Sequence, residues 1–564
     1  MPHRFLSAVI ILLLHSCRPT PPPQRFDLII FGGTVIDGSG NTPYTADVGI
    51  RADTIAAIGN LQGATADDTI RADGLVVCPG FINMNSMAAQ SLMMDGRAMS
   101  DIRQGVTLEI FGEGWSPAPV RRKNQAEADS LWETLEGFFC YMMKKGVSPN
   151  IASFVGHTSV RNLVMGLQNR QPGEKEMSKM NKLVALAMEQ GALGLSSSLI
   201  YPPATFAKTD ELIALARTTA QYGGIYITHI RSESDFIYDG LREAFRIANE
   251  ANIPVEIYHL KINHARNWNK IDTVLALIDS ARKAGLNITA NMYPYAASNT
   301  ALAERIPDWV QEGGGAAMRK RLSDPSIRKK VLYEMRTGIP APNSHPDDVM
   351  ILGFRSDSLN RLYMGKRLSE VARLHGKNAD ETVLDLIIAD KSPAAAVYFL
   401  QSEENVKKIM QQPYVSFGSD GAAFDTTKLF AGWNTHPRAY GTFARVLGKY
   451  VREEKVLPLT EAIRRMTSLP ATNLKLPKRG LLKTGYYADI VVFNPEKVKD
   501  NATYENPKQF ATGVLHVLVN GKVVLRNETH TGALPGRVVK RTTKRFCENY
   551  SIGLQPIVQL LIFR

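Results

Sequence analysis

Two histidines stand at equivalent places in the sequence. His229 ends the apolar, β-branched run 224–229, and His259 ends the similar run 254–259. Between them, residues 240–250 have apolar side chains at the spacing of an amphipathic helix. The two imidazoles are therefore one strand–helix unit apart, and at the carboxyl ends of neighbouring parallel strands they would lie close together. Neutral imidazole is a good zinc ligand, so the matched pair favours a metal site over two unrelated histidines.

The surrounding sequence predicts the elements that position this pair. Residues 81–477 alternate predicted strands and helices, which is typical of a parallel α/β barrel, whereas residues 26–80 and 478–538 form short strands joined by tight turns. Two β-rich flanks around an α/β middle predict a small β-sandwich built from both chain ends. Within the middle, residues 302–375 are rich in charge, glycine and proline and are interpreted as an insertion or lid. Residues 539–564 do not fit the β pattern and form a tail of unclear role.

Length and composition exclude some classes of partner. The chain has 564 residues, of which 44% are hydrophobic and 21% are charged, as expected for one large and one smaller globular domain. Its formal net charge is +13, but the basic residues are scattered and form no long run. Because no nucleic-acid motif accompanies them, we interpret the charge as a solvated surface and expect no nucleic-acid partner.

The N-terminus predicts export. Residues 1–16 have a short basic start and an apolar core, which is typical of a secretory signal and too short to span a membrane stably. Leu14-His15-Ser16-Cys17 resembles a bacterial lipobox, in which the cysteine is lipidated, and the rest of residues 1–24 forms a proline-rich tether. We therefore expect a lipid anchor at Cys17, facing the periplasm of a bacterial cell envelope, as the only membrane contact. The alternative is a cleaved signal with a chance cysteine.

A series of short motifs runs through the chain. They are the segments 31–38, 78–82, 105–107, 114–119, 191–197, 228–231, 259–261, 293–295, Gly418-Ser419-Asp420-Gly421, His436-Pro437-Arg438-Ala439-Tyr440-Gly441-Thr442-Phe443, 487–489 and 532–537. Taken in this order and number, they resemble the amidohydrolase superfamily, and within it the N-acyl-D-amino-acid deacylases, or D-aminoacylases, over residues 26–538. The resemblance implies a distorted (β/α)8 barrel with a small β-sandwich, in agreement with the pattern of predicted strands and helices.

The resemblance also implies a ligand set for zinc. Relatives have a His-x-His pair after the first barrel strand, but Asn85 and Met87 stand in those places here and are poor zinc donors. The D-aminoacylases resemble one another in a second position, where a strand-end cysteine and two later histidines hold zinc. Glu113 takes the place of that cysteine, and a carboxylate also ligates zinc. We therefore predict one zinc per chain at Glu113, His229 and His259.

Further roles are implied by the same resemblance. Asp420 is expected beside the water that attacks the substrate, as general base and then general acid. Lys261 is expected to bind an acidic group of the substrate. Weaker candidates for that contact are Tyr293, Ser298 and Arg231.

Each of these residues also has a structural interpretation. Glu113 is then a buried acid paired with Arg231, Asp420 caps a turn, and Lys261 is a surface cation. His157 is either a core histidine with satisfied hydrogen bonds or a further site residue.

The sequence therefore predicts a zinc-dependent hydrolase of linear amides. The expected substrates are N-acyl-D-amino acids, small molecules that would give a carboxylate and a free D-amino acid. One alternative is a metal-free pseudoenzyme that binds a ligand without hydrolysing it, because both first-strand histidines are replaced. The other is a related amidohydrolase acting on cyclic amides or dipeptides.

Overall fold

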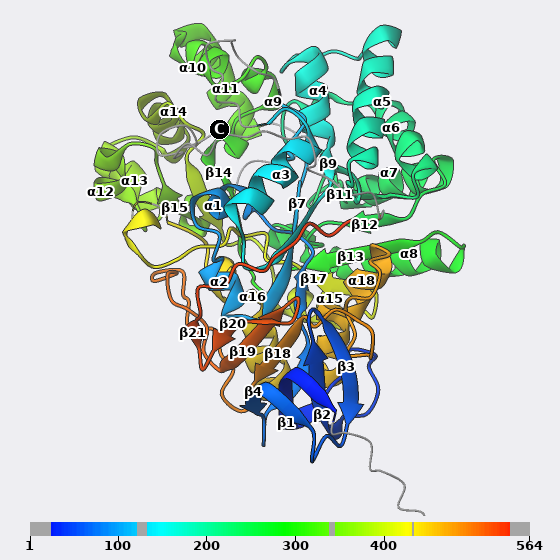
Figure 1. Ribbon diagram of the computed structural model, residues 1–564. Coiled ribbons are helices and arrows are strands. Elements are labelled where there is room, and N and C mark those ends of the chain that lie inside the picture. Colours follow the sequence, from blue (N-terminus) through cyan, green and yellow to red (C-terminus); the bar gives the residue numbers. More distant parts are fainter. Residues whose placement is uncertain (1–23, 121–131, 338–343, 431, 433, 542–564) are drawn as a thin grey trace, which may run out of the picture.

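Parallel strands form the centre of the computed structural model, which describes residues 24–120, 132–337, 344–430, 432 and 434–541 (Figure 1). Two parallel sheets, β6-β7-β8 and β9-β10-β11-β12-β13-β17, follow one another around a barrel. Only Phe154 separates β8 from β9, so the two sheets share one broken strand, and Met84 N–H donates to the Phe417 carbonyl at 3.3 Å beside β17. The described strands thus close into a distorted eight-stranded barrel. Their bounds are β6 (Phe81–Asn83), β7 (Val106–Phe111), β8 (Asn150–Ser153), β9 (Val155–Gly156), β10 (Gly194–Ser198), β11 (Ile225–His229), β12 (Val255–Ile257), β13 (Ile288–Met292) and β17 (Val415–Phe417).

Helices cover the outside of the barrel because each has one apolar face. In α7 (Ile237–Glu250), for example, Leu241, Ala244 and Ile247 are buried while charged residues face solvent. The strands beneath are buried on both faces, which explains their continuous apolar runs. The other helices around the barrel are α1 (Ala89–Met94), α2 (Met99–Ile102), α3 (Leu135–Lys145), α4 (His157–Met165), α5 (Glu174–Glu189), α6 (Thr209–Gln221), α8 (Ile271–Lys283), α15 (Glu403–Met410), α16 (Arg438–Arg445), α17 (Leu459–Met466) and α18 (Ser468–Asn473).

Strands from both ends of the chain join in one sheet below the barrel in Figure 1. The sheet has the order β21-β20-β19-β18-β5-β1-β2-β3, and β4 also pairs with β1. The junction lies where β18 runs antiparallel to β5. Side chains such as Ile30, Val48 and Ile490 form its core. The bounds are β1 (Arg25–Val35), β2 (Tyr44–Arg51), β3 (Thr54–Gly59), β4 (Thr65–Arg71), β5 (Val76–Pro79), β18 (Ile490–Phe493), β19 (Val514–Val519), β20 (Lys522–Arg526) and β21 (Thr529–His530).

An insertion with its own core lies between β13 and β17. It contains a three-stranded antiparallel sheet in the order β14-β16-β15, flanked by helices (Figure 1). A separate cluster of buried side chains, including Leu322, Val331 and Ile387, holds it together. It spans more of the chain than the predicted residues 302–375, because β16 returns at Ala395–Tyr398 to complete the sheet. The remaining bounds are β14 (Ser298–Ala301), β15 (Val349–Gly353), α9 (Asp308–Gln311), α10 (Gly315–Ser323), α11 (Pro325–Thr337), α12 (Asp357–Tyr363), α13 (Leu368–His375) and α14 (Ala379–Asp390).

The last described residues run back along the barrel. Val538 bridges to Ile151 beside β8, and Val539 N–H donates to the Ile151 carbonyl at 2.8 Å. Of the helices in the described residues, none is long and apolar enough to cross a membrane.

Candidate metal centre

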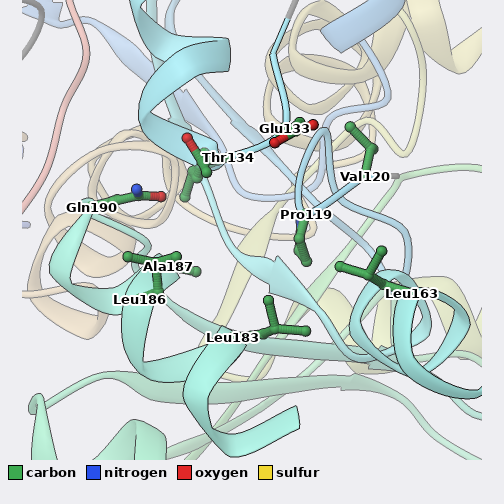
Figure 2. Close-up of a pocket in the computed structure, with 10 residues that line it drawn as sticks. Pro119, Val120, Glu133, Thr134, Leu163, Leu183, Leu186, Ala187 and Gln190 are labelled. Carbon is green, nitrogen blue, oxygen red and sulfur yellow. The ribbon is translucent and has the colours of Figure 1, made fainter. Parts of the chain in front are cut away.

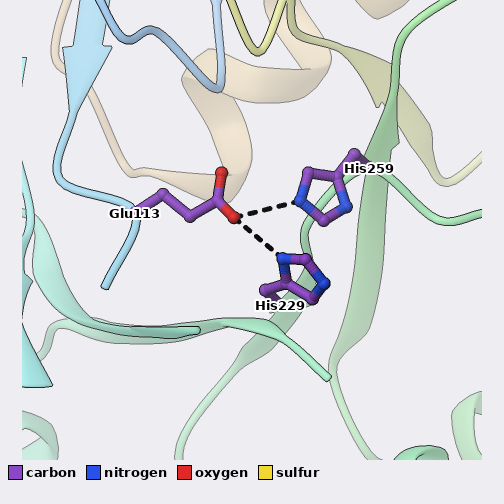
Figure 3. A group of neighbouring side chains, drawn as sticks. All are labelled: Glu113, His229 and His259. Atoms are coloured by element: carbon purple, nitrogen blue, oxygen red, sulfur yellow. Dashed lines mark hydrogen bonds and ion pairs between the residues drawn. The ribbon is translucent and has the colours of Figure 1, made fainter. Parts of the chain in front are cut away.

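Three predicted ligands meet at the carboxyl ends of the barrel strands. Glu113 Oε1 lies 3.0 Å from His229 Nδ1 and 3.0 Å from His259 Nε2 (Figure 3). One ligand atom from each residue lies within 4.8 Å of the others, and all three side chains are buried. His229 is the last residue of β11, and His259 follows β12 by two residues. The parallel register of β11 with β12 brings these strand ends together, as the sequence pattern predicts.

The loop that carries Glu113 approaches the neighbouring strands closely. Gly112 and Gly114, on either side of it, have φ values of +109° and +65°. A Cβ on Gly112 would lie 2.7 Å from the Phe154 carbonyl oxygen, and one on Gly114 would lie 2.7 Å from Ser198 Cβ. Only glycine suits both the backbone conformation and the space. The two glycines therefore allow the Glu113 carboxylate to reach across to the histidines.

The geometry and chemistry of these residues fit a zinc ion. Ligand atoms of a tetrahedral zinc at 2.0–2.1 Å lie about 3.4 Å apart, close to the 3.0 Å contacts here. Burial and Lys261 both lower the pKa of His259, but Glu113 and Glu233 outweigh them and raise it to about 9. Burial raises the pKa of Glu113, yet the two histidines hold it well below its usual range. Carboxylate and protonated imidazole in contact form a set whose protons a divalent cation replaces on binding.

A second buried carboxylate, Glu233, lies on the other side of the imidazoles. Its Oε1 is 3.3 Å from His229 Nε2 and 3.1 Å from His259 Nδ1. The same oxygen accepts a hydrogen bond from Lys261 Nζ at 2.5 Å. Sequence reasoning missed Glu233, although its place four residues after a predicted strand-end histidine was a usable signal.

Asp420 lies at the end of β17 with its carboxylate paired to Arg438. Its Oδ2 is 2.8 Å from an Arg438 guanidinium nitrogen, and its φ of +46° turns the chain sharply after the strand. Burial raises the pKa of the Asp420 carboxyl; the charge of Glu113 adds to this effect, and Arg438 opposes it. Sequence reasoning did not select Arg438, even though it belongs to one of the matching motifs.

The residues predicted to bind substrate divide into two groups. Lys261 and Tyr293 lie beside the metal group: Lys261 Nζ is 5.7 Å from the Tyr293 ring centre, and Tyr293 packs near His259. Arg231 instead pairs with Glu243 and donates to backbone carbonyls, so its guanidinium is engaged away from the three ligands. Ser298 begins β14, opposite Tyr398 in the insertion.

His157 belongs to a separate buried network. Its Nε2 lies 2.8 Å from Glu211 Oε1, and Arg161 donates to the other oxygen of Glu211 at 2.5 Å. This network links α4 to α6, and none of these contacts involves a candidate metal ligand.

Asn85 and Met87 occupy the places of the missing first-strand histidines, and amides of Asn83 and Asn85 contact two buried glutamates. Asn85 Nδ2 donates to Glu113 Oε2 at 2.7 Å, and Asn83 Nδ2 donates to Glu109 Oε2 at 2.9 Å. Met87 is 42% exposed. In this structure Asn85 therefore orients the second oxygen of Glu113.

A pocket of about 390 Å³ lies away from the metal group (Figure 2). It is mostly apolar and is lined from α3, α4, α5 and the segments that flank them, with Leu163, Leu183 and Leu186 among its walls. None of the three metal-binding candidates lines it.

Comparison with known proteins identifies the family. Residues 68–525 match the model of the amidohydrolase family. The chain belongs to the amidohydrolase family. It is 36% identical to a D-aminoacylase of Alcaligenes xylosoxydans xylosoxydans over 92% of this chain and 98% of that protein. It is 33% identical to the N-acyl-D-glutamate deacylase of the same organism, over 92% and 97%. The predicted resemblance and the predicted enzyme class, an amidohydrolase acting on carbon–nitrogen bonds other than peptide bonds, are thereby confirmed.

Solved structures agree on the fold. A crystal structure of D-aminoacylase matches with a TM-score of 0.77 and 34% identity, over 92% of this chain and all of that one. The N-acyl-D-glutamate deacylase of Bordetella bronchiseptica, complexed with zinc and a phosphonate inhibitor, matches with a TM-score of 0.78 and 30% identity, over the same shares. An L-hydantoinase at 14% identity, with a TM-score of 0.55, shares the fold alone. The predicted fold class is confirmed.

Proposed function

We propose that this amidohydrolase removes the acyl group from N-acyl-D-amino acids with one zinc ion held by Glu113, His229 and His259. The observation that carries the proposal is the convergence of these three buried side chains at the carboxyl end of the barrel. A carboxylate and two histidines with an open fourth position form an established catalytic zinc arrangement. The substrate class rests on the names of the relatives, which are a D-aminoacylase and deacylases of N-acyl-D-glutamate and N-acyl-D-aspartate.

Zinc held there supplies Lewis acidity, which polarises an amide carbonyl and makes water a stronger acid. The Asp420 carboxylate takes the proton of the attacking water and later delivers it to the leaving amine. A raised pKa suits both roles because it brings the carboxyl closer to the pH at which the enzyme works. Because Arg438 lies 2.8 Å from Oδ2 of Asp420, the proposed proton transfer is assigned to Oδ1.

Cations near the metal group suit a substrate that carries a carboxylate. Lys261 and Arg438 both approach Tyr293, at 5.7 and 4.7 Å from its ring centre. Tyr293 is itself buried, and its hydroxyl accepts a hydrogen bond from Gln401 at 3.1 Å. A free amino-acid carboxylate placed here would meet positive charge on two sides.

The proposal is tested by metal content followed by turnover. Untagged protein is purified without chelators, and zinc per chain is measured by plasma mass spectrometry. The protein is then assayed on N-acetyl-D-amino acids with apolar and acidic side chains, on their L-enantiomers, on hydantoin and on dipeptides. About one zinc per chain with turnover confined to the D-enantiomers is expected. Turnover of hydantoin or dipeptides alone would reassign the substrate, and a chain that takes no zinc on reconstitution would instead be a ligand-binding protein.

We also propose that the protein is exported and anchored by a lipid on Cys17, a residue outside the described part of the chain. The support for export is in the sequence: residues 1–16 have a short basic start and an apolar core, and Cys17 follows them in a lipobox-like motif. In cell fractionation, the wild type should remain with membranes and a Cys17→Ala variant should be released. Equal release of both would contradict the anchor.

A further inference from the structure

One oxygen of Glu233 faces both imidazoles and a lysine. Oε1 lies 3.3 Å from His229 Nε2, 3.1 Å from His259 Nδ1 and 2.5 Å from Lys261 Nζ. Its other oxygen accepts from Asn263 Nδ2 at 3.3 Å. His229 Nε2 is fully buried and makes no hydrogen bond among the described residues, and its 3.3 Å distance to Glu233 Oε1 is an ion-pair contact. Glu233 therefore lies where it can accept the outer proton of each ring.

The two histidines turn opposite nitrogens toward Glu113. His229 presents Nδ1 and His259 presents Nε2. A nitrogen that ligates a metal carries no proton, so the proton of each neutral ring must sit on the nitrogen facing Glu233. These two protons are on different atoms, Nε2 of His229 and Nδ1 of His259. A single acceptor that faces both atoms would favour the proton on Nε2 of His229 and the proton on Nδ1 of His259.

We propose that Glu233 is a positioning residue that fixes the opposite tautomers of His229 and His259 and so prepares both for metal binding. The proposal rests on the proposed zinc site. It assigns Glu233 no contact with the substrate, and it follows the general rule that a ligating histidine donates its other N–H to an acceptor outside the metal site.

Lys261 makes this acceptor necessary. Its Nζ lies only 2.7 Å from His259 Nδ1, and an ammonium has protons to donate but no lone pair to accept. When His259 Nε2 binds a metal, Nδ1 keeps its proton, so two donors face each other. Glu233 Oε1 accepts a hydrogen bond from Lys261 Nζ and lies 3.1 Å from His259 Nδ1, so this one oxygen faces both donors. Without Glu233, Lys261 would donate to Nδ1, and the ring proton would move to Nε2, the nitrogen that has to bind the metal.

Charge supports the same assignment. Lys261 and a divalent cation together bring three positive charges into a buried space, and Glu113 alone would offset one of them. Glu233 is buried, and its Oε1 lies within 3.3 Å of nitrogen atoms of His229, His259 and Lys261, so its negative charge offsets part of the positive charge gathered there. A second carboxylate therefore reduces the cost of burying the cations.

The test measures zinc affinity by competition with a chromophoric chelator, which is independent of activity. Glu233→Gln keeps an acceptor oxygen but loses the charge, and its affinity should fall about 10- to 100-fold. Glu233→Ala removes the acceptor and should bind more weakly still. Adding Lys261→Met to Glu233→Ala removes the competing donor, so the double variant should recover at least several-fold over Glu233→Ala. Glu211→Gln, another buried carboxylate that faces a histidine, is the matched control and should bind zinc as the wild type does.

Each outcome decides between roles. If Glu233→Gln and Glu233→Ala bind zinc as tightly as the wild type, Glu233 is not a positioning residue, although the zinc site stands. If the double variant binds no better than Glu233→Ala, the competition by Lys261 is wrong and the tautomer argument fails. An equal loss in Glu211→Gln would show a general effect of destabilising the fold. A wild-type chain that takes up no zinc would overturn both this inference and the proposed function.

Discussion

Glu109 and Glu113 are only four residues apart, yet the pKa values of their carboxyl groups are shifted in opposite directions. Glu109, on β7, is buried against amides and hydroxyls, and burial raises its pKa to about 7 despite hydrogen bonds from Ser86 and Asn83. Glu113, just beyond β7, is also buried, but two histidines hold its pKa well below the usual range. Burial is common to both, so the neighbours decide the difference.

The same contrast separates two regions of the site, one formed at the ends of β11 and β12 and the other at the ends of β6 and β7. In the half formed by β11 and β12, His229 and His259 contact Glu113, and Glu233 and Lys261 lie on the other side of the imidazoles. In the half formed by β6 and β7, Asn85 and Met87 stand in the places of the first-strand histidines, and Asn85 contacts Glu113 only as a hydrogen-bond donor. One half is therefore built to hold a cation and the other to hold neutral groups. This is the physical basis for expecting one zinc and not two.

Removing the Glu113 carboxylate, which contacts residues of both halves, should have the largest effect on zinc content and activity. Glu113→Ala deletes the only carboxylate of the proposed ligand set, so zinc content should fall close to zero and activity should fall at least a thousandfold. Plasma mass spectrometry and steady-state rates measure the two losses. Thermal unfolding should stay broadly similar because the variant also removes a buried charge. Activity that survives with full zinc content would show that Glu113 is a structural acid.

Asp420→Asn should separate chemistry from metal binding. Zinc content should stay at the wild-type value, while kcat falls about 10²- to 10⁴-fold through loss of the general base. In the wild type, kcat/KM should fall as pH drops through the pKa of Asp420, because only the ionised form accepts a proton. Burial raises that pKa above its ordinary value of 3.8, so the fall should begin at a higher pH than an exposed aspartate would give. A pH–rate profile of the variant that keeps the same acidic limb would assign the limb to another group.

The sequence predicted the three proposed ligands because each stands at a predicted strand end or in a matching motif. Strand ends of a parallel barrel converge, so local patterns were enough to bring His229 and His259 together. Glu113 came from the family resemblance, in which it takes the place of a strand-end cysteine. Glu233 and Arg438 were missed because their partners are set by loops, and loop paths do not follow from periodicity. Arg231 shows the same limit: it neighbours a ligand in sequence, yet its side chain turns to Glu243.

Introducing histidines at positions 85 and 87 should give the half formed by β6 and β7 metal ligands of its own. Asn85→His with Met87→His places one imidazole where Asn85 now contacts the second oxygen of Glu113 at 2.7 Å, and a second imidazole two residues further along the chain. Metal content after reconstitution should rise from about one to about two ions per chain, as measured by plasma mass spectrometry. Asn85→Leu with Met87→Leu is the matched control and should hold no more metal than the wild type. A histidine variant that still binds only one ion would mean that the two half-sites are not adjacent in the way inferred here.

The smallest effect is expected at Glu109, and it tests whether the two glutamates really differ in charge. The pKa of Glu109 is raised from 4.5 to about 7 in the folded protein, so folding favours the protonated form. That stabilisation, on the order of 3 kcal/mol, is complete below about pH 4.5 and is lost as pH rises from there to about 7. The amide introduced by Glu109→Gln resembles the neutral acid and does not titrate. Between pH 5 and pH 8 the melting temperature of the wild type should therefore fall more than that of the variant. An equal fall in both proteins would mean that Glu109 is ionised, as Glu113 is. Hydrogen bonds from its neighbours would then outweigh the effect of burial on the pKa of Glu109, just as the two histidines outweigh it for Glu113.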